Sequence, residues 1–144
     1  MKSVRKTVLV SHSIERMYTL VDTVEDYPQF LPWCGGAMTR ERTETSVEAE
    51  IQISYHGVKQ SFVTQNDNRP PERIDMKFVR GPFKSLAGHW HFVPLGDLGC
   101  RVEFSLDYEF ANGVLERLVG PLFDTITDTF VDAFVRRADA VYPV

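Results

Sequence analysis

The sequence GVLERLVGPLFDTITDTFVDAFVRRADAVY, residues 113–142, decides the fold of this chain. Its apolar residues recur every three or four positions, which is the spacing of one α-helix. At about 1.5 Å per residue, such a helix spans about 45 Å, so it must cross a whole sheet rather than lie beside one strand. Gly120 and Pro121 fall inside the pattern. We expect a kink or short break there, because proline lacks the N–H that a helix interior needs.

The apolar arc of this helix is wider than the usual stripe that faces a core. We therefore expect it to contact partners on more than one side. The opposite face carries Asp124, Asp128 and Asp132 at four-residue spacing. A metal site is one interpretation of this ladder, but no histidine accompanies it, and a solvated face is favoured.

Length and composition predict a single domain over residues 1–144. The 144 residues are 43% hydrophobic, enough for a sizeable core. The net charge of −4 does not indicate DNA binding or more than peripheral membrane contact. No signal peptide, transit peptide or membrane span is evident, so a cytoplasmic location is expected. Cys34 and Cys100 lack metal-ligand spacing, which favours reduced structural thiols over a redox pair.

The first third of the chain predicts one strand, two short helices and a lid. Residues 6–10 are rich in β-branched side chains, which predicts a strand. Ser11 or Ser13 then caps a helix that ends near Val21, and residues 22–27 form a further helical turn or two. A proline-bounded aromatic segment follows, and it is either a lid on the core, which we favour, or an exposed contact patch. The segment consists of Tyr27, Phe30, Leu31 and Trp33.

From Met38 onward the hydrophobic period changes to two, the signature of antiparallel strands with one wet face. His56 and Gly57 predict a tight hairpin turn. Residues 33–36 are expected to form a flexible corner, and residues 66–71 a loop. The predicted class is α+β: a curved antiparallel sheet of about six or seven strands, wrapped on one long C-terminal helix. The clearest strands are 47–55, 58–65, 74–78, 86–93 and 100–110.

Candidate chemistry is sparse. His89 and His91 share one face of a strand, as in some zinc sites, but a third ligand is missing and surface histidines are favoured. No motif for a nucleophile, metalloprotease or phosphate loop appears. We therefore predict no catalytic residue and no metal. Four polar residues are candidates for positions that face the cavity, and either ligand contact or a bond within the core would explain them. They are Tyr55, Gln60, Thr64 and Tyr108.

Three segments resemble the coenzyme Q-binding, START-like family: residues 20–34, 81–90 and 108–112. This family includes the bacterial ribosome-association toxin and is often labelled polyketide cyclase/dehydrase. The resemblance extends from Lys2 to Tyr142. It implies a helix-grip fold with a deep hydrophobic cavity and no catalytic cofactor. In the quinone branch it implies carriage of ubiquinone for respiration without chemistry, and in the toxin branch contact with the large ribosomal subunit that blocks subunit association.

Three hypotheses follow, in order of preference. The first is a carrier for a hydrophobic small molecule, with ubiquinone, a related polyprenyl quinone or another lipid as its ligand. The second is a toxin-like protein acting on the large ribosomal subunit, and the third is a polyketide cyclase/dehydrase, which would need an acid or base inside the cavity. The predicted ligand-binding residues are Phe30, Leu31, Trp33, Ile53, Tyr55, Phe62, Met76, Phe78, Trp90, Phe92, Phe104, Leu106, Tyr108, Leu122, Ile126 and Phe130.

Overall fold

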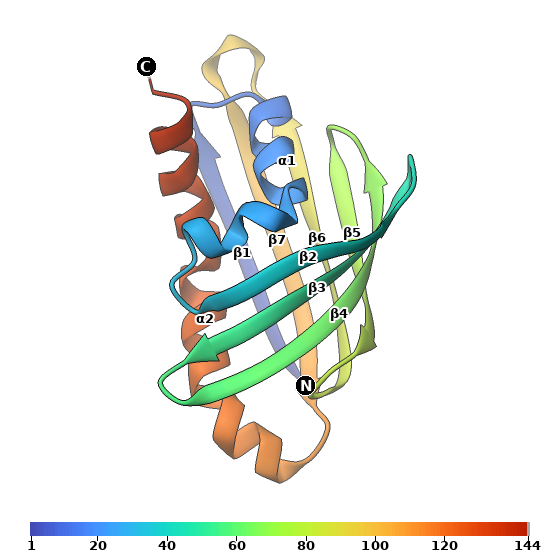
Figure 1. The fold of residues 1–144 in the computed structure, drawn as a ribbon. Coiled ribbons are helices and arrows are strands. Elements are labelled where there is room, and N and C mark those ends of the chain that lie inside the picture. Colours follow the sequence, from blue (N-terminus) through green and yellow to red (C-terminus); the bar gives the residue numbers. More distant parts are fainter. Residues whose placement is uncertain (144) are drawn as a thin grey trace.

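A computed structural model describes residues 1–143, which form a seven-stranded antiparallel sheet wrapped around a long C-terminal helix (Figure 1). The strand order is β1-β7-β6-β5-β4-β3-β2, so the first strand pairs with the last and the others follow as a meander. This confirms the predicted helix-grip α+β class. The strands are β1 (Lys2–Val10), β2 (Cys34–Arg42), β3 (Ser46–Tyr55), β4 (Val58–Arg69), β5 (Arg73–Arg80), β6 (Phe83–Pro94) and β7 (Cys100–Phe110).

Two short helices follow β1, as the sequence predicts. Helix α1 (Ile14–Asp22) begins where the Ser13 side chain accepts a hydrogen bond from the Arg16 N–H at 3.2 Å. The 3₁₀ helix η1 (Val24–Gln29) comes next, and a second 3₁₀ turn, η2 (Gly96–Leu98), joins β6 to β7. No helix within residues 1–143 is long and apolar enough to span a membrane.

Helix α2 (Gly113–Val141) passes across the inner face of the sheet (Figure 1). The Asn112 side chain caps its first turn by accepting from the Leu115 N–H at 2.9 Å. The helix is continuous through Pro121, so the expected break is absent, but its first turns are inclined to the rest in Figure 1. The missing proline N–H leaves the turn to bend without ending the helix.

Two segments expected to be irregular belong largely to strands. Strand β2 begins at Cys34, where a flexible corner was expected, and β4 continues to Arg69, so that only residues 70–71 of the loop expected at 66–71 lie in a turn. Gly35 lies in this strand, and glycine is needed there because a Cβ would approach the Ser54 Cβ to 2.7 Å. In β4, the turn-forming character of asparagine and aspartate is overridden by pairing with β5, where Asn66 lies opposite Met76. This extension matters because it carries Asn66 onto the inner face.

The inner face of the sheet and α2 enclose the hydrophobic core. Strand β7 shows the pattern most clearly, since every second residue from Cys100 to Phe110 is buried. The tight turn at His56 and Gly57 is confirmed, with φ of 51° and 82°. The aromatic segment after η1 packs on the core, with Tyr27, Leu31 and Trp33 all buried, so it is a lid rather than an exposed patch.

Candidate functional site

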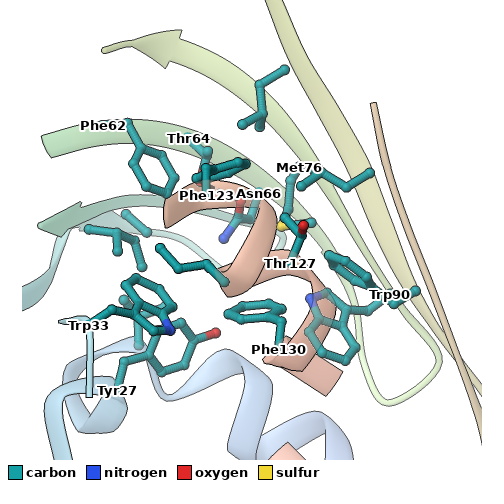
Figure 2. Close-up of a pocket in the computed structure, with 17 residues that line it drawn as sticks. Tyr27, Trp33, Phe62, Thr64, Asn66, Met76, Trp90, Phe123, Thr127 and Phe130 are labelled. Atoms are coloured by element: carbon teal, nitrogen blue, oxygen red, sulfur yellow. Dashed lines mark hydrogen bonds between the residues drawn. The ribbon is translucent and has the colours of Figure 1, made fainter. Parts of the chain in front are cut away.

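An apolar cavity of about 80 Å³ lies between α2 and the inner face of the sheet (Figure 2). Strands β3 to β7 supply one wall, α2 the opposite wall, and the region from η1 to Trp33 closes it. The residues that line it are Val24, Tyr27, Trp33, Ala49, Ile51, Phe62, Thr64, Asn66, Met76, Leu86, Trp90, Phe104, Leu106, Phe123, Ile126, Thr127 and Phe130.

The cavity is smaller than the deep one implied by the family resemblance. Its volume of about 80 Å³ is below the roughly 300–1,000 Å³ of common ligand pockets, and a benzene-binding cavity measures about 150 Å³. A polyprenyl tail does not fit in this conformation. A long ligand would have to displace side chains that are only partly buried, such as Phe62, Met76 and Phe130.

Aromatic packing fills the space beyond the cavity. The ring of Phe134 on α2 lies 5.1 Å from Phe130, 5.2 Å from Trp90 and 5.3 Å from Tyr27, measured between centroids. These edge-to-face contacts are favourable beyond the area that they bury. Phe134 itself is fully buried. The helix–sheet interface is therefore closed at the C-terminal end of α2 and hollow near its middle.

A few polar groups interrupt the apolar lining. Thr64 donates a hydrogen bond to the Asn66 Oδ1 at 3.0 Å, and the Thr127 hydroxyl donates to the Asp124 backbone oxygen at 3.1 Å. The Tyr27 hydroxyl donates to the Val21 backbone oxygen. Burial raises the pKa of Tyr27 well above its ordinary value, so it stays protonated. The lining contains no aspartate, glutamate, histidine, lysine or arginine.

The structure brings part of the predicted site together. The predicted residues that line the cavity are Trp33, Phe62, Met76, Trp90, Phe104, Leu106, Ile126 and Phe130. They come from five elements and the lid, and share positions on the inner face or on one side of α2. Their role in binding a ligand remains a prediction, because their placement alone does not measure affinity.

The other predicted residues lie outside the lining. Tyr55 is at the tip of the β3–β4 hairpin, 40% exposed and against the His56 ring. Tyr108 takes the inner-face position expected for it, but its hydroxyl donates a hydrogen bond to the Asp124 carboxylate at 3.0 Å. The remainder pack into the core or against its edge: Phe30, Leu31, Ile53, Phe78, Phe92 and Leu122.

Several lining residues were not predicted as site residues. Ala49, Ile51 and Leu86 continue the alternation of predicted strands, and Phe123 and Thr127 lie one turn from Ile126 or Phe130. Periodicity would have identified these. Val24 and Asn66 gave no such indication, since one belongs to a short helical turn and the other to an expected loop. Of the polar candidates, Thr64 lines the cavity and Gln60 does not.

The histidine pair lies on the outer face of the sheet, as predicted. The His91 Nδ1 lies 3.2 Å from the Glu103 carboxylate, which also accepts from Arg101 at 2.8 Å. Burial, with the positive charge of Arg73 beside it, lowers the pKa of His89. Residues 1–143 contain no cluster of three metal-ligating side chains.

Both cysteines are buried and free. Burial raises the pKa of the Cys100 thiol to about 11 and also raises that of Cys34. A thiol that stays protonated is a poor nucleophile and a poor metal ligand. Both side chains thus behave as small core residues.

Comparison with known proteins places the fold and the cavity in a family. Residues 10–135 match the model described as "polyketide cyclase / dehydrase and lipid transport". The chain belongs to this family. A START superfamily protein from Mycobacterium smegmatis has the same fold, with a TM-score of 0.79, 24% identity, and 96% and 98% of the two chains covered.

Two curated relatives bear on function. The ribosome association toxin RatA of Vibrio cholerae is 42% identical over 142 residues, which cover 99% of each chain. The mitochondrial coenzyme Q-binding protein COQ10 homolog B of Xenopus laevis is 27% identical over 139 residues, covering 93% of this chain and 57% of that protein. The chain is therefore similar to both branches that the sequence resemblance implied, and more so to the toxin.

Proposed function

We propose that this protein associates with the ribosome, on the large subunit, and hinders the joining of the two subunits. The observation that carries the proposal is the 42% identity to the ribosome association toxin RatA over 99% of both chains. The large subunit as the target comes from the family resemblance. This reverses the order of the first two hypotheses drawn from the sequence.

The size of the interior supports this order. A cavity of about 80 Å³ leaves little room for a ligand that would itself define the function. The outer face of the sheet, in contrast, carries many charged side chains. Its charges are arranged in pairs, such as Arg5 with Asp107 at 2.9 Å and Arg73 with Asp75 at 3.0 Å.

This paired surface predicts how ribosome binding responds to salt. Each cation that contacts an RNA phosphate releases counterions, so a strongly basic protein loses affinity steeply as salt rises. The net charge here is −4, and many cations are already neutralised by neighbouring carboxylates. We expect the binding to weaken with salt, but with a shallow slope.

Sedimentation with separated ribosomal subunits tests the proposal. The purified protein is mixed with large or small subunits and centrifuged through sucrose at 50, 100 and 200 mM salt. We expect comigration with the large subunit only. Protein that stays at the top of both gradients at 50 mM salt would contradict the proposal.

A variant with a filled cavity is the matched control. Ala49 lies in the lining and is 1% exposed, so Ala49→Val adds two methyl groups to the interior without altering the surface. Unchanged comigration is expected. Loss of ribosome binding in a folded Ala49→Val protein would assign the interaction to the interior instead of the surface.

A second candidate function is binding of a neutral apolar molecule in the cavity, with ubiquinone as the specific ligand. The apolar lining favours it, and the relative named as a coenzyme Q-binding protein adds weight. Burial of apolar ligand surface contributes roughly 25 cal/mol per Å² without any charged contact. Solvent extraction of protein purified from quinone-producing cells, followed by mass spectrometry, tests it. Stoichiometric quinone is expected, and its absence together with failure of added quinone to bind would contradict this candidate.

A further inference from the structure

The Asn66 amide is held in one orientation inside the cavity. Strand β4 places Thr64 and Asn66 on the inner face, where the Thr64 hydroxyl donates to the Asn66 Oδ1 at 3.0 Å. This bond directs the amide oxygen toward Thr64 and leaves the amide nitrogen facing the space between Trp33, Phe130 and Trp90 (Figure 2).

The amide nitrogen is a donor without an acceptor. Within residues 1–143 the hydrogen bond of the Asn66 side chain is the one from Thr64, which uses the oxygen. An amide donor in an apolar site is unfavourable unless something accepts from it. Thr127, on the opposite wall, has its hydroxyl proton committed to the Asp124 backbone oxygen at 3.1 Å. Its oxygen keeps lone pairs that could accept, but among the described residues no hydrogen bond from the Asn66 amide nitrogen reaches it.

The lack of charged side chains in the lining restricts the chemistry of any ligand. Because no ionic side chain lines the cavity, an entering carboxylate, phosphate or ammonium group would lose its hydration without gaining a counter-charge. Tyr27 offers no compensation, since its hydroxyl proton is donated to the Val21 backbone oxygen. A neutral acceptor oxygen suits the site.

We propose that the Asn66 amide is a subsite for the carbonyl oxygen of a neutral apolar molecule, such as a quinone or another conjugated ketone. The inference rests on the second candidate of the proposed function and adds to it the chemical group that is recognised. Thr64 is its positioning residue. The cavity receives the carbonyl end, and the partly buried Phe62, Met76 and Phe130 yield to admit the ring.

Two small probes that differ in the carbonyl test this subsite. Menadione carries two ring carbonyls, and 2-methylnaphthalene has a similar shape and none. Equilibrium dialysis of each probe against the protein measures affinity. The chain contains two tryptophans, Trp33 and Trp90, and both line the cavity, so quenching of their fluorescence by menadione reports where it binds.

Asn66→Leu removes the donor while keeping a side chain of similar size. We expect it to lower menadione affinity about fivefold, the effect of one neutral hydrogen bond, and to leave 2-methylnaphthalene affinity within about twofold. Gln65→Leu is the matched control, because Gln65 is the neighbouring amide on the exposed face of β4. It is expected to change neither affinity.

Thr64→Val is the second variant, in case Asn66→Leu fails to fold. It keeps the shape of Thr64 and removes the bond that orients the amide, so menadione affinity is expected to fall about two- to threefold. Equal losses for both probes, or no loss in either variant, would overturn the subsite and leave apolar ligand binding intact. Failure of the wild-type protein to bind either probe would overturn both.

Discussion

Strand β6 divides two regions that differ in almost every respect. Its inner face presents Trp90, which packs on Phe130 of α2, and Phe92, which packs on Tyr18 of α1, and each is 1% exposed. Its outer face presents His89 and His91, which lie among charged side chains of β5 and β7 such as Glu103. Successive residues of one strand thus belong to an aromatic core and to a polar surface.

The inner face therefore contributes mainly to stability, and the outer face is the one available for recognition of a partner. Burial of large aromatic side chains is the main favourable contribution to folding, whereas exposed ion pairs contribute little. The outer charges can therefore be exchanged for contacts with a partner at small cost to the fold. The inner face cannot change freely except at the cavity, where packing is incomplete.

The largest expected effect is on the inner face of β6. Phe92 stacks on Trp90 with 6.1 Å between ring centroids and contacts the edge of Tyr18 at 6.0 Å. Phe92→Ala should lower the free energy of unfolding by about 3–5 kcal/mol. The neighbouring His91→Ala should change it by less than about 1 kcal/mol. Urea denaturation measures both, and similar values for the two variants would remove the distinction between the faces.

The next effect compares two buried alanines. Ala138 at the closed end of α2 is fully buried, and Ala138→Val should destabilise by about 1–3 kcal/mol through overpacking. Ala49 lines the cavity, so Ala49→Val should raise stability by about 0.5–1 kcal/mol as it fills empty space. Thermal unfolding of the two variants provides the measurement. A destabilised Ala49→Val would mean that the cavity does not accept added volume.

Alkaline pH should reveal the buried tyrosines. Burial raises the pKa of both Tyr18 and Tyr108 from 10.0 to about 12, and Asp22 and Asp124, respectively, add to the shift. Because the folded pKa lies above the unfolded one, this contribution is complete below pH 10 and is lost as pH rises toward 12. Absorbance at 295 nm should show these two hydroxyls titrating later than in urea. Titration at the ordinary pKa would contradict their burial.

The smallest effect is on the outer face of β7. The hydrogen bond from Arg101 lowers the pKa of Glu103 below its ordinary 4.5, and the one from His91 contributes further. A carboxyl group whose pKa is lower in the folded than in the unfolded protein stabilises the fold above pH 4.5, and this contribution is lost as pH falls. Arg101→Ala should change stability by no more than about 0.5 kcal/mol and raise the Glu103 pKa. Carbon NMR of the carboxyl group measures the shift, and an unchanged pKa would assign it to another cause.

The fold was largely predictable from periodicity, because alternation in β7 and helical spacing in α2 each continue over many residues. The errors fell where local composition and tertiary pairing disagree. Asn66 belongs to a run of turn-forming residues, yet pairing with Met76 makes it part of β4. Gly35 belongs to β2, where the opposite strand approaches too closely for a side chain, although glycine pairs commonly mark a turn.

The site was predictable only in part, since a list of inward positions does not say where packing fails. Trp90 and Phe92 are both inner-face residues of β6, but one lines the cavity and the other closes the core. That outcome depends on how the rings of Phe130 and Phe134 fit together in three dimensions. The sequence pattern does not show how these rings pack together, and the volume of the cavity depends on that packing.

Light scattering during subunit joining tests the central claim most directly. Small and large ribosomal subunits are mixed while the magnesium concentration is raised, and scattering increases as they combine. With the protein present at a stoichiometric amount, we predict that the increase is suppressed, equally by the wild-type protein and by Ala49→Val. Joining at an unchanged rate and extent in the presence of excess wild-type protein would contradict the account.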